Sequence, residues 1–142
     1  MELTKIQKEA IEKLKETGIY FDFPKTDLIL VKQKEIIYNQ LFSNKQLYIL
    51  AREIFPTVRI IPAVYSLDLS LITIEWVTKK MRLYGINSKD LQRQIGFEKE
   101  TINDFLKLRT QLKPLEKSSL YYYFQSFETN KHYLEYLKKK ML

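Results

Sequence analysis

The side chains best suited to recognition chemistry in this sequence lie between residues 88 and 107. Lys99, Thr101, Asn103 and Lys107 recur at positions that a helix would turn outward. An asparagine amide both donates and accepts hydrogen bonds, and it can pair bidentately with the edge of adenine. Lysines neutralise phosphates without reading the base sequence. These residue types suit contact with double-stranded DNA, and Asn103 is the best candidate among them to read a base.

Carboxylates share this segment and point to a second chemistry. Glu98, Glu100 and Asp104 interleave with the residues above. A carboxylate repels phosphate and only accepts hydrogen bonds, for example from the amino group of cytosine. The alternative interpretation is therefore a protein-binding helix whose acidic residues complement a basic surface on a partner.

Two short helices joined at a glycine would position these side chains. Ser88 is suited to cap a helix, and Asp90 adds negative charge to its first turn. Leu91 and Ile95, four residues apart, share one face of that helix, and Gly96 allows a sharp turn. In the second helix the apolar residues turn inward, and these are Phe97, Ile102, Phe105, Leu106 and Leu108.

The segment resembles the Xre/Cro-type (lambda-repressor-like) helix-turn-helix family over about residues 73–127. The residues that carry the resemblance are Ser88, Leu91, Gly96, Phe97, Ile102 and Phe105. Gln92 departs from the family pattern, which has a small residue there, and its long side chain predicts a splayed helix pair. The resemblance implies a transcriptional regulator that occupies an operator as a homodimer, because one motif reaches only one half-site. The alternative is a small phage or mobile-element protein that uses the helix-turn-helix as a protein-binding inhibitor, for example of a nucleic-acid-binding defence complex. The phosphate contacts would come from Arg93, Arg109, Lys113 and Lys117.

Charge is distributed unevenly along the chain. The sequence carries 24 Lys and Arg against 17 Asp and Glu, a formal net charge of +7. Residues 67–142 hold 14 basic and 9 acidic residues, whereas residues 1–66 hold 10 and 8. This asymmetry favours a polyanionic partner, bound with an affinity that depends on salt.

Several function classes find no support in the composition. The chain has no cysteine and a single histidine, His132, so it offers neither a thiolate nucleophile nor a cluster of metal-binding residues. It also lacks a phosphate-binding glycine loop. No apolar run approaches the roughly 18 to 20 residues needed to cross a bilayer. We expect a cytoplasmic protein that is not an enzyme and uses no metal, cofactor or membrane.

The periodicity of apolar residues predicts a mainly α protein of two parts. Residues 1–66 form an N-terminal helical module of unknown role, and residues 67–142 form the helix-turn-helix domain with a C-terminal helix. Helices are expected over residues 4–17, 34–42, 45–55, 70–84, 116–127 and 130–142. Residues 19–31 read as an extended link, and the β-branched runs around Pro62 predict a short strand at a sheet edge. The last helix carries Tyr133, Tyr136 and Leu137 on an apolar face, with which it could dimerise or fold back onto its domain.

Overall fold

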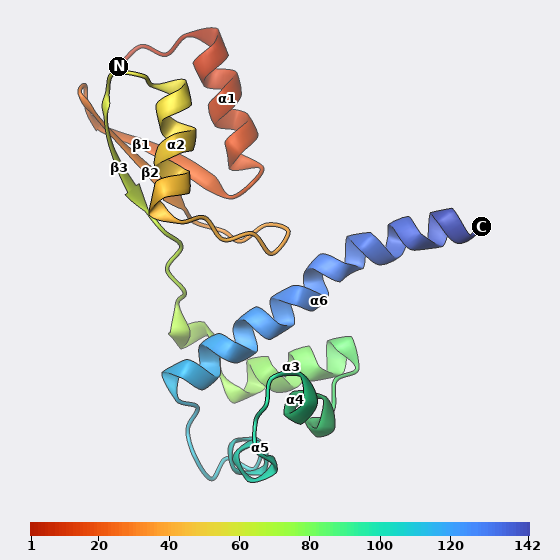
Figure 1. The fold of residues 1–142 in the computed structure, drawn as a ribbon. Helices are drawn as coiled ribbons and strands as arrows, with labels where there is room; N and C mark the ends of the chain where they lie inside the picture. The colour runs from red at the N-terminus through yellow and green to blue at the C-terminus, as the bar shows by residue number, and fades with distance from the viewer. The chain divides into compact units, whose positions relative to one another are not determined.

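Six α-helices and three β-strands make up the chain, which the computed structural model describes in full from Met1 to Leu142 (Figure 1). The chain divides into two units, residues 1–66 and residues 67–142. None of its helices combines the length and the apolar character that crossing a membrane requires.

The N-terminal unit is built on a three-stranded mixed sheet. Its elements are α1 (Lys5–Lys15), β1 (Ile19–Lys25), β2 (Leu28–Gln33), α2 (Asn44–Ile54) and β3 (Arg59–Ala63). The strand order is β1-β2-β3, with β1 antiparallel and β3 parallel to β2. Strand β3 contains Pro62 and lies at an edge of the sheet, where a missing N–H donor is tolerated.

Both helices of this unit begin with a capping box. The Thr4 hydroxyl accepts from the Gln7 backbone N–H, and the Gln7 side chain accepts from the Thr4 N–H. Ser43 and Gln46 repeat this arrangement at the start of α2. Each box satisfies amides that would otherwise lack partners in the first turn. The Gln7 amide also donates to the Ile54 carbonyl at 3.2 Å and so ties α1 to the end of α2.

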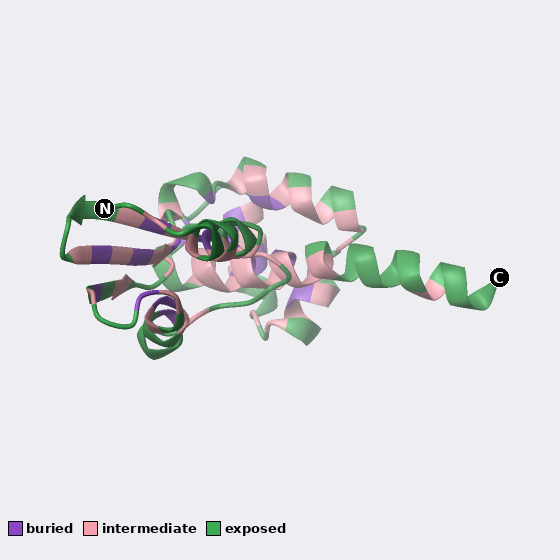
Figure 2. Ribbon diagram, turned by 90° about the horizontal axis from the view of Figure 1, so that it is seen from above, coloured by how far each residue is buried: buried purple, intermediate pink, exposed green.

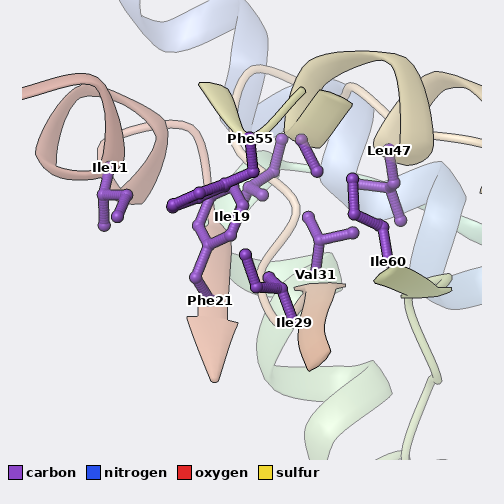
Figure 3. Close-up of a cluster of buried hydrophobic side chains, with 9 residues drawn as sticks. Ile11, Ile19, Phe21, Ile29, Val31, Leu47, Phe55 and Ile60 are labelled. Carbon is purple, nitrogen blue, oxygen red and sulfur yellow. The ribbon is translucent and has the colours of Figure 1, made fainter. Parts of the chain in front are cut away.

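Alternate strand residues form the core of this unit with the two helices. Ile19, Phe21, Ile29 and Val31 point from the central and first strands toward side chains of both helices (Figure 3). The remaining members of the buried cluster are Ile11, Leu47, Ala51, Phe55 and Ile60. Because successive strand side chains face opposite sides, both helices cover the same face of the sheet.

The predicted fold class is wrong for this unit. Residues 34–42 form no helix, and residues 19–31 are paired strands instead of a link. The chain after β2 is held by the buried side chain of Gln33, which donates to the Glu35 and Gln40 carbonyls and accepts from the Phe42 N–H. These bonds replace helical ones, so the fold is mixed α and β instead of mainly α.

The C-terminal unit is helical. It consists of a 3-10 helix, η1 (Leu69–Leu71), followed by α3 (Ile74–Tyr84), α4 (Ser88–Gln94), α5 (Lys99–Leu106) and α6 (Pro114–Met141). Thr73 caps α3 by accepting from the Trp76 N–H, so this helix begins four residues later than the predicted residue 70. Gly85 ends α3 in left-handed geometry, with φ of +67°.

A second apolar core holds these helices together. Its buried members are Ile72, Val77, Leu91, Ile102, Phe105, Leu112, Leu120 and Phe124. Residues 114–141 form one continuous helix, although the sequence predicted two. The first half of α6 packs into this core, whereas its last residues are mostly exposed (Figure 2).

Candidate nucleic-acid interface

The orientation of α5 is fixed by two buried side chains. Ile102 and Phe105 are fully enclosed, and α5 packs against both α3 and α4. The Phe105 ring meets the half-buried Phe97 ring edge-on, with 6.0 Å between their centroids. This anchoring leaves the opposite side of α5 facing outward.

A stripe of three polar residues follows the outward side of α5. Lys99 and Asn103 are four residues apart on α5 and share one of its faces, and Lys107, four residues after Asn103, caps the end of the helix on the same side. Both lysines are exposed and Asn103 is half-buried, and the Asn103 side-chain amide makes no hydrogen bond within the chain. Thr101, also half-buried, lies on a different flank, because successive helical residues are rotated by about 100°. Three of the four predicted α5 residues are therefore brought together.

The turn that presents α5 follows α4. Asn87 caps α4, accepting from the Asp90 N–H at 3.0 Å while the Asp90 carboxylate accepts from the Asn87 N–H at 2.9 Å. The expected cap, Ser88, is instead the first residue of the helix. Gly96 adopts φ of +86°, which suits a residue without a side chain. Arg93 is exposed on α4.

Local structure accounts for the three carboxylates of α5. Glu98 and Glu100 lie at the N-cap and in the first turn, where negative charge complements the helix dipole. Both are exposed, and neither makes a hydrogen bond or an ion pair through its carboxylate. Asp104, in contrast, lies 3.8 Å from the Arg109 guanidinium. Only the Asp104 charge is thus partly offset by a nearby cation, whereas Glu98 and Glu100 keep their full repulsion toward phosphate.

A groove of about 610 Å³ lies beside the start of α3. It brings together Arg109 and Lys117, two cations that the sequence separates by a loop. The Lys117 ammonium also donates to the Leu69 carbonyl at 3.3 Å, which links α6 to η1. The complete lining is Ile72, Thr73, Ile74, Leu108, Arg109, Thr110, Gln111, Leu112 and Lys117.

The groove includes two residues that no sequence motif marks. Thr110 and Gln111 line it because the fold brings their loop beside α3. Leu108 was expected to turn inward, but it is 70% exposed and adopts φ of +60° where the chain leaves α5. Lys113 is exposed just before α6, outside the groove lining.

Aromatic contacts and hydrogen bonds hold α6 against α3 and α4. The Tyr84 hydroxyl donates to Glu128, and burial together with this carboxylate raises the pKa of Tyr84 to about 12. The Tyr123 hydroxyl donates to Gln94, and burial, followed by the nearby Asp90 charge, raises the pKa of Tyr123. These bonds hold α6 against α3 and α4, and these helices carry several basic side chains of the unit.

A lysine on α3 lies beside the same aromatic residues. The Lys80 ammonium is 5.7 Å from the Trp76 ring centroid and 5.9 Å from that of Tyr84, within cation–π range. Trp76 is partly buried and packs against the apolar core.

No group of three or more His, Cys, Asp or Glu side chains is arranged to hold a metal ion.

The geometry thus defines a helical unit in which a turn presents one short helix with a polar outward stripe. Comparisons of the chain with known protein families, with curated proteins and with solved structures find no match.

Proposed function

We propose that the C-terminal unit binds double-stranded DNA and that the protein regulates transcription by occupying an operator. The observation that carries this proposal is the stripe of Lys99, Asn103 and Lys107 on the rigidly anchored helix α5. Its central amide has no partner within the chain, so it is free to bond a base edge. The lysines on either side supply positive charge for the flanking phosphates.

The other cations would fix the position of the unit on the duplex. Arg93 on α4 and Arg109, Lys113 and Lys117 after α5 would contact phosphate and carry no sequence information. One such unit reads one half-site, so operator recognition calls for two copies on a palindrome. Repression would then follow from blocking access to the promoter.

Selection of bound molecules from a random duplex pool tests the proposal. Fluorescence anisotropy on the selected duplex would compare low and near-physiological salt. We expect one palindromic sequence to survive the higher salt. Asn103→Ala should lower affinity for that sequence by about 1 to 3 kcal/mol while leaving random DNA unaffected. Lys113→Ala should weaken binding to every sequence and reduce the salt dependence by about one charge.

A matched control is Gln111→Ala, which removes an exposed amide outside α5. It should leave sequence preference unchanged. Binding that vanishes at near-physiological salt and enriches no sequence would contradict the proposal, since it would reduce the basic residues to a generic surface.

A protein-binding role is the second candidate, favoured by the exposed Glu98 and Glu100 carboxylates that make no ion pair. With Asp104 they would complement a basic surface, for example that of a nucleic-acid-binding complex. Reversing all three to lysine should then abolish function in cells while nonspecific affinity for DNA rises. Retained function in this triple variant would eliminate the second candidate.

A further inference from the structure

Helix α6 continues well past the core of its own unit. Leu120 and Phe124 are buried in that core, and Phe127 is the last apolar α6 residue packed against it. Most of the residues from 128 to 141 are exposed (Figure 2). Most helical stability in proteins comes from packing of an apolar face, so this segment, which we call the arm, lacks the usual source of stability.

The arm extends the same apolar stripe that its first half buries. Leu120, Phe127, Leu134 and Met141 are spaced at intervals of seven residues. A coiled-coil seam consists of apolar residues that recur every seven residues, with a second seam residue three positions after each of them. Here the second position is held by Tyr123, Asn130 and Leu137. Leu134 and Met141 are 56% and 82% exposed and Leu137 is half-buried, so most of the outer part of the seam is uncovered.

We infer that the occupant of this seam is a second copy of the chain, paired in parallel through its own arm. The argument rests on which charges each pairing brings together. Tyr133 directly precedes the seam residue Leu134. In a parallel pair, such a residue lies beside the residue of the other chain whose number is five higher, so Tyr133 would lie beside the second copy's Lys138. A lysine over a tyrosine ring is favourable. An antiparallel pair would gain a contact of the same kind between Tyr133 and Lys140, so the choice between the pairings rests on contacts between lysines.

The antiparallel alternative places like charges opposite each other. Lys131 and Lys138 directly follow the seam residues Asn130 and Leu137. In an antiparallel pair the residues at these places lie opposite each other, so Lys131 of one chain would face Lys138 of the other. Two such lysine contacts would form, each unfavourable. The polar Asn130 in the seam further restricts the register, because pairing it with an apolar residue would leave its amide unsatisfied.

The pairing should be weak in the free protein. The uncovered seam covers about two heptads, fewer than the three to four of a sustained coiled coil. This inference rests on the arm alone, but it supplies the second copy that operator recognition requires. DNA with two half-sites would strengthen the pairing, because binding the first copy raises the effective concentration of the second.

Single-cysteine crosslinking tests the inference, since the chain contains no cysteine. In a parallel pair Met141→Cys places its thiol next to that of the second copy, so oxidation without DNA should yield a disulfide-linked dimer. Lys139→Cys is the matched control, because residue 139 is also exposed but points away from the seam. We expect at least several-fold more dimer for residue 141 than for residue 139, increasing with protein concentration.

Two further variants decide between pairings and exclude trivial outcomes. Leu134→Lys, combined with Met141→Cys, should abolish the excess crosslinking without unfolding, because Leu134 lies outside the core. A mixture of Asn130→Cys and Met141→Cys chains would crosslink to each other if the arms were antiparallel, which would overturn the parallel pairing.

Equal crosslinking at residues 139 and 141, or no dimer at any concentration, would overturn the inference altogether. That result would follow if another segment of the same chain, or a different protein, covered the seam. Selection of DNA is a separate measurement from crosslinking. Crosslinking tests whether the arms pair, and selection tests whether the protein binds an operator, so the two failures can be told apart. A selected single half-site, for example, would retain DNA binding and remove the dimer.

Discussion

The guanidinium of Arg109 lies 3.8 Å from the carboxylate of Asp104, beyond the end of α5. One cation of the expected phosphate-binding set is thus partly neutralised by an acidic residue of the same helical unit. Because both side chains are substantially exposed, the pair contributes little to stability, and its main effect is on the electrostatic field that phosphate meets.

Removing the Asp104 charge should therefore increase DNA affinity. Asp104→Asn frees Arg109 and removes one repulsive charge, so we expect about a two- to fivefold gain in nonspecific affinity at low salt, and less at high salt. Fluorescence anisotropy with a random duplex measures this. Glu9→Gln on α1 changes the net charge equally at an exposed site of the other unit. Equal gains for both variants would show that only the total charge matters.

Gln33 should be among the most sensitive polar positions of the N-terminal unit. Its side chain is 3% exposed and makes three hydrogen bonds to the segment from Glu35 to Phe42. Gln33→Leu leaves the Gln40 carbonyl and the Phe42 N–H without these partners. We expect a loss of about 1 to 3 kcal/mol in the free energy of unfolding, measured by urea denaturation. Gln111→Leu, an exposed site, should change it by less than about 0.5 kcal/mol.

These hydrogen bonds of Gln33 also explain why the helix predicted over residues 34–42 does not form. Ile36, Ile37 and Leu41 have helical spacing, but Tyr38 and Asn39 adopt positive φ values of 53° and 57°. The backbone bonds of a helix are replaced here by bonds to the side chain of Gln33, and periodicity carries no information about such a partner. The parallel pairing of β2 with β3 is hidden for the same reason, because it depends on contacts between separated segments.

The candidate site was more predictable, because its elements are set by local signals. Leu91, Ile102 and Phe105 are buried as their spacing indicates, and Gly96 turns the chain between the two helices. Leu108 was misassigned because its position depends on how the chain leaves α5, where it adopts left-handed geometry. The groove that joins Arg109 to Lys117 could not be foreseen, since it depends on the packing of a loop beside α3.

Two glycines with similar backbone angles should respond differently to alanine. Gly18 and Gly96 have φ of +83° and +86°. A Cβ on Gly96 would meet nothing within 4 Å, so Gly96→Ala should cost only torsional strain, about 1 kcal/mol. A Cβ on Gly18 would lie 2.3 Å from the Glu35 carbonyl oxygen, so Gly18→Ala should cost at least about 2 kcal/mol.

Chemical denaturation of the two variants measures the difference. The Glu35 carbonyl can move only by disturbing the backbone after β2, where the Lys34 N–H donates to the Gly18 carbonyl at 2.9 Å. Equal losses for the two alanine variants would show that this backbone yields freely, and that the close approach at Gly18 imposes no constraint beyond the torsional one.

Tyr84 should make the C-terminal unit sensitive to alkaline pH. Its pKa in the folded chain is about 12, above the ordinary value of 10.0, because of burial first and the Glu128 carboxylate second. Between these two values the unfolded chain loses this proton more readily than the folded one. The contribution of the neutral hydroxyl is therefore complete below about pH 10 and is lost as pH rises toward 12.

Tyr84→Phe removes the titrating group, so its free energy of unfolding should fall less steeply over the same range than that of the unmodified protein. The difference should be on the order of 1 kcal/mol, because water screens part of the effect at a half-buried ring. Urea titrations at several pH values, followed by fluorescence of the single tryptophan, Trp76, report on this unit. Tyr136→Phe, at an exposed ring of α6, should retain the slope of the unmodified protein. If Tyr84→Phe retained that slope as well, the Tyr84 hydroxyl would ionise as it does in the unfolded chain, and its bond to Glu128 would not hold α6 against α3.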